Sequence, residues 1–204
     1  APPPVPHAPR LHPSLMPAPP PLLGCASDLD TATSSVKPSA RNTRYVDASL
    51  TVPHGVLYPM SLVNVAFDRE AIGVAMFPGL PGVDERPVDD SFVGLCAKVV
   101  ADHLSMGHKT GIPYVWRADA SSGPVGGVAA AMAKDSKCLA FLEELIPFFA
   151  SVGPLGASST TAYAAYTELA AEVRAKLAPR DAYFGKLADG MAAWAECWKA
   201  CAQP

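Results

Sequence analysis

The distribution of proline constrains this chain more than any other feature of its sequence. Prolines dominate residues 1–24, with an unbroken run at Pro2–Pro4 and another at Pro19–Pro21. Because proline lacks a backbone N–H and fixes φ, this stretch cannot form a helix or a central strand. We expect it to be extended and mobile, with polyproline II character. The residues leave two interpretations open: a linker, or a ligand for a proline-binding module.

The composition of the 204-residue chain is that of a packed protein. Hydrophobic residues make up 50% and charged residues 17%, so a globular core is expected. The net charge of -3 and the pI of about 5.9 argue against nucleic acid or an anionic membrane as partners. No stretch approaches the roughly 20 apolar residues of a membrane helix. Since the first residue is Ala1 and not Met, we expect a processed chain or a fragment.

The cysteines do not form a recognisable metal or disulfide pattern. They are odd in number and include no CxxC pair, and they stand at Cys25, Cys96, Cys138, Cys197 and Cys201. We expect reduced and mostly buried thiols in a reducing compartment. Cys197 and Cys201 lie four residues apart on one face of an expected helix, so a redox pair or a metal site is the alternative interpretation.

Hydrophobic periodicity and turn residues predict a mixed α/β chain whose last third is helical. The expected strands are residues 46–52, 62–67 and 108–117, and the expected helices are residues 68–77, 89–106, 138–151, 158–177 and 181–201. Asp68 is a good N-cap for the first helix. Asp89 or Asp90 is expected to cap the second helix, which should stop at Gly107. These strands are too few for a complete doubly wound sheet, which indicates an incomplete domain.

The second expected helix carries an apolar stripe that includes a histidine. The stripe consists of Phe92, Cys96, Val99, Val100 and His103. We interpret His103 as a partly buried structural residue rather than a ligand, because the histidines of the chain are not spaced as a metal cluster.

Two groups of residues have side chains capable of acid–base chemistry or of ligand binding. Asp89 and Asp90 follow a glycine-rich loop, where carboxylates cap a helix, accept a proton from a hydroxyl or hold a divalent cation. Lys109 and Trp116 stand near the two ends of an expected strand, where a cation neutralises phosphate and an aromatic ring stacks on a sugar or base. The bland interpretations, helix caps and core residues, remain open from spacing alone.

Six segments of the chain, read together, resemble the plant and algal UDP-arabinopyranose mutase (reversibly glycosylated polypeptide) family. They keep the family's order and nearly its spacing from Val36 to the C-terminus. The matching residues are Val36–Pro38 with Arg41–Ala48; Asn64–Glu70 with Ile72, Gly73, Ala75 and Met76; Asp89, Asp90, Gly94 and Cys96; Asp102–Leu104, Gly107 and Lys109–Trp116; Glu143–Phe149; and Tyr183–Phe184, Lys186–Met191 and Trp194.

This resemblance implies a fold and an activity. The fold would be a partial Rossmann-like sheet of the nucleotide-sugar glycosyltransferase type, followed by a helical C-terminal region. Residues 1–36 would be a proline-rich disordered tail, and residues 37–204 the C-terminal part of the mutase-like domain. The activity would be the interconversion of UDP-arabinopyranose and UDP-arabinofuranose for cell-wall polysaccharides, with a Mn²⁺ or Mg²⁺ ion, in the cytosol or peripheral to the Golgi.

The same resemblance suggests roles for particular residues. Asp89 and Asp90 would be catalytic, and Asn64, Lys109 and Trp116 would bind the UDP-sugar. No metal ligand is assigned, because the family's Asp triplet lies in an N-terminal half whose place is taken here by the proline-rich stretch. Full-length family members, in homo- or hetero-oligomers, are the expected protein partners; no nucleic acid is expected.

The chain also departs from the family pattern. Arg117 stands where the family has His after its tryptophan, and an arginine neither titrates nor ligates a cation. Phe92 and Leu95 replace two tryptophans. A non-catalytic paralogue that serves as a binding or scaffold subunit is therefore the alternative to a fragment of a working mutase.

Overall fold

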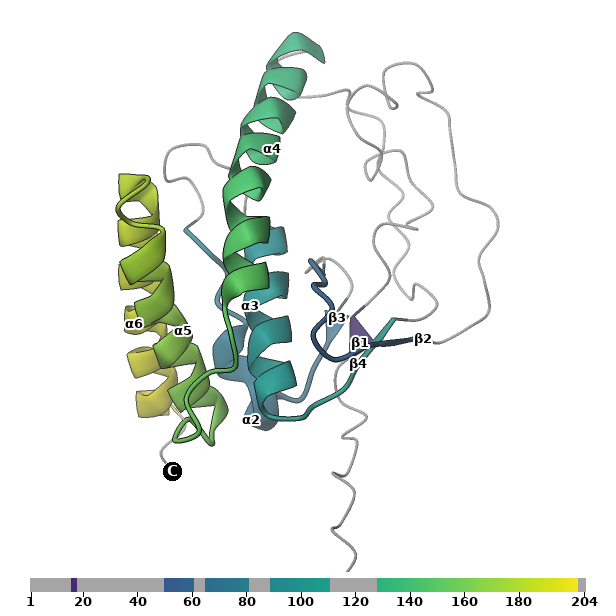
Figure 1. Ribbon diagram of the computed structural model, residues 1–204, viewed down its shortest axis with the longest axis vertical. Coiled ribbons are helices and arrows are strands. Elements are labelled where there is room, and N and C mark those ends of the chain that lie inside the picture. Colours follow the sequence, from purple (N-terminus) through teal and green to yellow (C-terminus); the bar gives the residue numbers. More distant parts are fainter. Residues whose placement is uncertain (1–15, 18–49, 61–64, 81–88, 111–127, 202–204) are drawn as a thin grey trace, which may run out of the picture.

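The computed structural model describes residues 16–17, 50–60, 65–80, 89–110 and 128–201. Two small strand pairs lie on one side of the molecule, and helices make up the rest (Figure 1). The strands are β1 (Met16–Pro17), β2 (Leu50–Val52), β3 (Val65–Ala66) and β4 (His108–Thr110). The helices are α2 (Arg69–Ile72), the 3-10 helix η3 (Gly73–Ala75), α3 (Asp89–His103), α4 (Val128–Ser151), α5 (Ala162–Lys176) and α6 (Ala182–Cys201). The prediction of a mixed α/β chain with a helical C-terminal region is confirmed.

Each strand pair is antiparallel. In the first pair, Met16 lies opposite Ala66 and Pro17 opposite Val65. In the second pair, Leu50 lies opposite Thr110 and Val52 opposite His108. Every described strand is therefore at the edge of its pair. A proline such as Pro17 is tolerated at an edge, because no second neighbouring strand needs the N–H that proline lacks.

Several predictions fall on residues outside those described. Residues 46–49, 62–64 and 111–117 of the expected strands lie outside the described ones, as does all of the proline-rich stretch except Met16–Pro17. Phe67 is described and lies after the end of β3. The division of the chain at residue 36, the mobility of the tail and the Rossmann-like sheet stay predictions.

Asp68 begins the first helix as the sequence predicted. Its Oδ1 accepts hydrogen bonds from the backbone amides of Glu70 and Ala71, at 2.9 and 3.1 Å. The α-helix is shorter than predicted, because η3 tightens it from Gly73 to Ala75. At Gly73 the ring of Trp198 lies so close that a Cβ atom would stand 2.4 Å from it, so only glycine lets α6 approach here.

The limits of α3 differ from those predicted. The helix already includes Asp89, so both aspartates lie in its first turn and neither is the cap. It ends at His103, before the predicted stop at Gly107. Ser105 adopts a left-handed φ of 56°, and the amide of Met106 bonds back to the carbonyl of Ala101 at 2.7 Å. That is a Schellman-type ending, in which a serine takes the position that the prediction gave to glycine.

The core forms around α3, which is covered on most sides. Of the predicted stripe, Phe92, Cys96 and Val100 are buried, whereas Val99 and His103 are half-buried. Leu95, outside that stripe, is buried as well. The ring of Phe92 meets that of Phe149 from α4 edge-on, with centroids 5.9 Å apart. The helical layer completes the core with buried residues from α5 and α6, including Tyr166, Leu169, Val173, Tyr183, Phe184, Leu187 and Met191.

The helix α4 begins at Val128, well before the predicted start at Cys138, and its first half extends past α5 and α6 (Figure 1). The part of α4 before Cys138 is rich in alanine, which favours a helix. Alanine does not produce the alternation of apolar and polar faces from which a helix is predicted. The helices α5 and α6 follow the predicted ranges, with Thr161 as the N-cap of α5 through a 3.2 Å bond from the Ala164 amide.

Two leucines of α4 test this packing. Leu145 is fully buried (0% exposed), whereas Leu139 is 62% exposed. We expect Leu145→Ala to lower the free energy of unfolding by about 2–5 kcal/mol, because it leaves a cavity. Leu139→Ala should change it by less than about 0.5 kcal/mol. Urea unfolding followed by circular dichroism measures both; equal losses would contradict the arrangement of α4.

Candidate functional site

The structure separates the residues that the sequence grouped as a substrate site. Asp89 and Asp90 stand at the N-terminal end of α3, and half-buried Lys109 lies in β4, which follows the other end of that helix (Figure 1). A helix of this length spans about 22 Å. Asn64 and Trp116 lie outside the described residues. The proposed catalytic and substrate-binding roles are therefore untested, and the described residues do not gather them at one point.

A polar cluster that the sequence did not predict lies at the C-terminal half of α3. Lys98 is 1% exposed, and its ammonium donates to Asp102 Oδ2 at 2.5 Å and to the Pro53 carbonyl at 3.1 Å. The amide of Gly55 also donates to Asp102 Oδ2, at 2.9 Å. The ring of His54 bonds to the backbone carbonyl of Asp102 at 3.0 Å. We call these five residues the Lys98–Asp102 cluster.

The cluster joins α3 to the turn that follows β2. A buried ammonium without its carboxylate is strongly destabilising, by about 3–5 kcal/mol in comparable pairs. The Lys98 ammonium and the Asp102 carboxylate therefore require each other. The turn after β2 supplies a further acceptor, the Pro53 carbonyl, and a further donor, the Gly55 amide. A lysine and an aspartate four residues apart on a helix are ordinarily a solvated pair. The sequence signal that could have revealed the burial of this pair is that Lys98 interrupts an apolar run.

His108 of β4 lies close to this cluster and is itself 1% exposed. Neither of its ring nitrogens has a hydrogen-bond partner among the described residues. Burial, and then the charge of Lys98, lowers the pKa of His108 from 6.5 to about 4, while the charge of Asp102 opposes the shift. The ring is therefore neutral at physiological pH.

A cavity of about 480 Å³ lies beside the Lys98–Asp102 cluster. Its polar lining includes His54, Lys98, Asp102 and His103. Its apolar lining includes Val99, Phe149, Val152 and Leu155. The ring of His103 bonds to the carbonyl of Ser159 at 2.8 Å, which confirms the prediction of a partly buried structural histidine.

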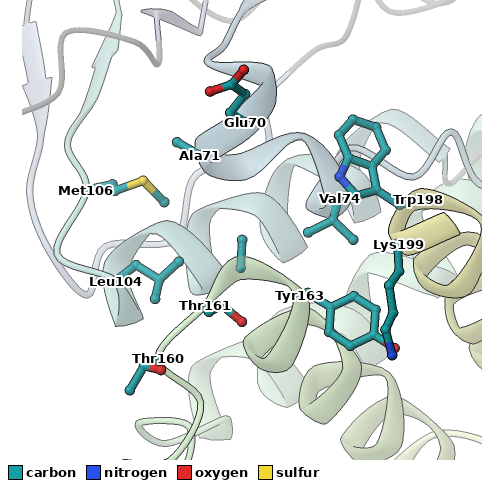
Figure 2. A pocket seen from close by; sticks show the side chains of 11 residues that line it. Glu70, Ala71, Val74, Leu104, Met106, Thr160, Thr161, Tyr163, Trp198 and Lys199 are labelled. Atoms are coloured by element: carbon teal, nitrogen blue, oxygen red, sulfur yellow. The ribbon is translucent and has the colours of Figure 1, made fainter. Parts of the chain in front are cut away.

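A second, larger cavity of about 660 Å³ lies where α2, the turn after α3, the start of α5 and the end of α6 meet. Figure 2 shows Glu70 and Lys199 at separate parts of its rim and Leu104 and Met106 along its wall. Its aromatic rings already have cationic partners: Lys199 lies 5.3 Å from the ring centroid of Tyr163, and Arg69 lies 5.5 Å from that of Trp198.

Further contacts tie the aromatic side chains around the second cavity to neighbouring groups of the protein. Tyr163 donates its hydroxyl proton to Glu196, and that hydrogen bond raises the pKa of Tyr163. Trp194, the neighbour of Trp198, donates its indole N–H to the Val74 carbonyl at 2.8 Å. The rings of the second cavity therefore serve the packing of α6 rather than offering free faces for a ligand.

The prediction that the cysteines are mostly buried is wrong for two of the three described here. Cys96 is buried, and burial raises the pKa of its thiol, but Cys197 and Cys201 are exposed rather than buried. All three are free thiols. Within the described residues, no three His, Cys, Asp or Glu side chains are grouped to hold a metal ion.

Across the described parts of the chain, no helix combines the length and the apolar character needed to cross a bilayer.

The described residues thus define a mixed α/β protein with a helical C-terminal region and a buried ion pair at the centre. The sequence profile of the family "Reversibly glycosylated polypeptide" matches residues 22–203, and the chain belongs to that family.

Curated relatives of known name are close in sequence. The chain is 47% identical to UDP-arabinopyranose mutase 1 of Arabidopsis thaliana over 174 residues, which are 84% of this chain and 47% of the relative. It is 47% identical to probable UDP-arabinopyranose mutase 2 of Solanum tuberosum and 46% identical to UDP-arabinopyranose mutase 1 of Oryza sativa subsp. japonica, each over 84% of this chain and 46% of the relative. The chain spans about half the length of these relatives.

The orphaned His108 makes stability depend on pH. Because its folded pKa lies below the unfolded value of 6.5, the unfolded chain binds more protons between pH 6.5 and about 4. The contribution of neutral His108 is thus complete above pH 6.5 and is lost as the pH falls toward 4. The shift corresponds to roughly 3 kcal/mol.

We expect His108→Leu to remove this pH dependence and to leave stability at pH 7.5 unchanged or higher, because two unsatisfied nitrogens disappear. Urea unfolding of both proteins at pH 7.5, 6 and 5 measures the effect. A parallel decline in the two proteins would show that His108 is not the group responsible.

Proposed function

We propose that this chain contributes the C-terminal part of a UDP-arabinopyranose mutase, which interconverts UDP-arabinopyranose and UDP-arabinofuranose. The observation that carries the proposal is the 47% identity over 174 residues to a protein named for that activity. The identity extends across most of this chain, so it includes the helical region and α3, not only a short motif. UDP-arabinose is accordingly the proposed substrate.

Asp89 and Asp90 are the proposed catalytic residues. Their place in the first turn of α3 supports this role, since the helix N-terminus favours ionised carboxylates there. An ionised carboxylate can orient the sugar hydroxyls while the glycosidic C–O bond breaks. Lys109 would neutralise phosphate, and Asn64 and Trp116 would contact the sugar or base.

A divalent cation is part of the proposal for the whole enzyme but not for any step assigned to this chain. The described residues do not fit such an ion, because they contain no group of three suitable ligands. The cation would therefore be held outside the described residues, and Asp89 and Asp90 would support it at most from a distance.

The same family suggests a fold, protein partners and a location in the cell. We propose a Rossmann-like sheet of the nucleotide-sugar glycosyltransferase type, which rests on the family resemblance alone, since the described strands form two separate antiparallel pairs. We also propose full-length relatives as partners in a homo- or hetero-oligomer, and a location in the cytosol or on the cytosolic side of the Golgi.

A non-catalytic subunit is the second candidate function. Phe92 and Leu95 stand where the family pattern has tryptophans, and both are 1% exposed in the core. They serve packing and present no indole N–H to a ligand. If these positions matter for the reaction in relatives, this chain would keep the fold and the partners but lose the chemistry.

We expect the purified 204-residue chain to bind UDP-arabinose weakly, even with Mn²⁺. A diphosphate needs compensating charge, and Coulomb energies between close charges reach several kcal/mol in a partly dry site. Isothermal titration calorimetry with and without Mn²⁺ measures this binding. A micromolar Kd would show that the chain holds a complete nucleotide and cation site.

A chimera separates the two candidate functions. The aligned half of the Arabidopsis thaliana relative is replaced by that of this chain, and conversion of UDP-arabinopyranose is followed by chromatography. We expect an active chimera in which Asp90→Asn lowers turnover at least about 100-fold, the size of a lost acid–base group. The matched control is Glu172→Gln, a half-buried carboxylate of α5 that pairs with Lys176 and should leave turnover unchanged.

An inactive but folded chimera would support the non-catalytic subunit. An active chimera in which Asp90→Asn matches the control would return Asp90 to a purely structural place in α3.

A further inference from the structure

The last two turns of α6 carry a pair of thiols on one face of the helix. Cys197 and Cys201 are both exposed and free, and α6 continues through Cys201. Side chains four residues apart in a helix are neighbours, with Cβ atoms about 5–6 Å apart. The helix therefore presents the two thiols side by side at the surface.

This spacing is too wide for a disulfide and suits a bridging metal ion. A disulfide brings its two Cβ atoms to about 3.5–4.5 Å. The last turns of α6 would have to distort for one to form. Two metal–sulfur bonds of about 2.3 Å each instead span about 4.5 Å between the sulfur atoms. Two ligands four residues apart on one helix are also the arrangement that holds zinc in helices of the HExxH type.

The charged residues beside the pair are engaged with another helix. The ammonium of Lys199 lies 5.3 Å from the ring centroid of Tyr163 in α5, and Figure 2 shows the two side chains next to each other. Glu196 accepts the hydroxyl proton of the same tyrosine. Lys199 is two residues from each cysteine, and helix residues at that separation do not face each other. Its ammonium therefore does not stand over Cys197 and Cys201 to repel a cation.

The chemistry of the pair selects the class of ion. Thiolates are soft ligands, which select copper(I), zinc or iron–sulfur clusters rather than magnesium or manganese. A structural zinc ion takes four ligands, and the described residues contain no group of three suitable side chains. Copper(I) differs because two thiolates in line can satisfy it.

We propose that Cys197 and Cys201 of one chain together bind one copper(I) ion. Each thiol releases its proton to the solvent, and each sulfur donates an electron pair to the metal. The oxidation state of the copper does not change, so the step needs no oxidant or reductant. The pair that the sequence left open as a redox pair or a metal site is thus assigned to a metal.

This site goes beyond the proposed mutase function. The cation of the mutase is Mn²⁺ or Mg²⁺, which prefers oxygen ligands. The thiols stand on α6, whereas Asp90 is in α3 and Lys109 in β4. Copper binding can therefore succeed or fail whatever the outcome with UDP-arabinose.

The test is an anaerobic titration of the reduced 204-residue chain with copper(I), in competition with the coloured chelator bicinchoninate. Cys25 and Cys138 are first replaced by Ser, which leaves buried Cys96 as the only other cysteine. We expect one ion per chain, with no change in the mass of the protein by light scattering. Cys197→Ser and Cys201→Ser should each weaken binding at least about 100-fold, because the chelate is lost.

A variant with one thiol moved is the matched control. Cys201→Ser combined with Lys199→Cys keeps two thiols at exposed positions but sets them two residues apart, on different faces of α6. We expect this variant to bind copper(I) like Cys201→Ser alone. The three positions on α6 are exposed, so circular dichroism should show the same helical content in every variant.

Three results would overturn the proposal. Parent-like affinity in a single serine variant would show that one thiol suffices. Parent-like affinity in the moved pair would show that the spacing does not matter. Half an ion per chain, together with a doubled mass, would show that the ion is shared between two copies.

Discussion

The buried ion pair between Lys98 and Asp102 is the interaction on which the rest of the described structure depends. An ammonium placed in the core must be compensated, and Asp102 lies one turn further along α3 to do so. The remaining bonding capacity of the pair then holds the turn at Pro53–Gly55 against the helix. Since that turn follows β2, and β2 pairs with β4, the ion pair fixes the small sheet relative to the helices.

The helix α3 has two ends with different character. Asp89 and Asp90 stand in its first turn, where the helix dipole favours ionised carboxylates. The Lys98–Asp102 cluster occupies its other half, where charges cancel and the neighbouring imidazole of His108 stays neutral. The buried helix α3 therefore separates Asp89 and Asp90 from the Lys98–Asp102 cluster.

Membership of the reversibly glycosylated polypeptide family accounts for the helical region as well as for α3. The match extends through residue 203, so α5 and α6 lie within the part of the chain that the family profile covers. Phe92 and Leu95 of α3 are both buried and contribute to the core that this helix organises.

Sequence reasoning was enough for the family, the helices α5 and α6, the Asp68 cap and the structural character of His103. These features depend on local periodicity, on one capping side chain or on a long run of matched motifs. The folded chain was needed to show that Lys98 is buried, that Cys197 and Cys201 are exposed, and that α3 ends at a left-handed Ser105. The partners of Lys98 at Pro53 lie 45 residues away in the chain, and a helical pattern records which face is apolar but not which distant segment covers it.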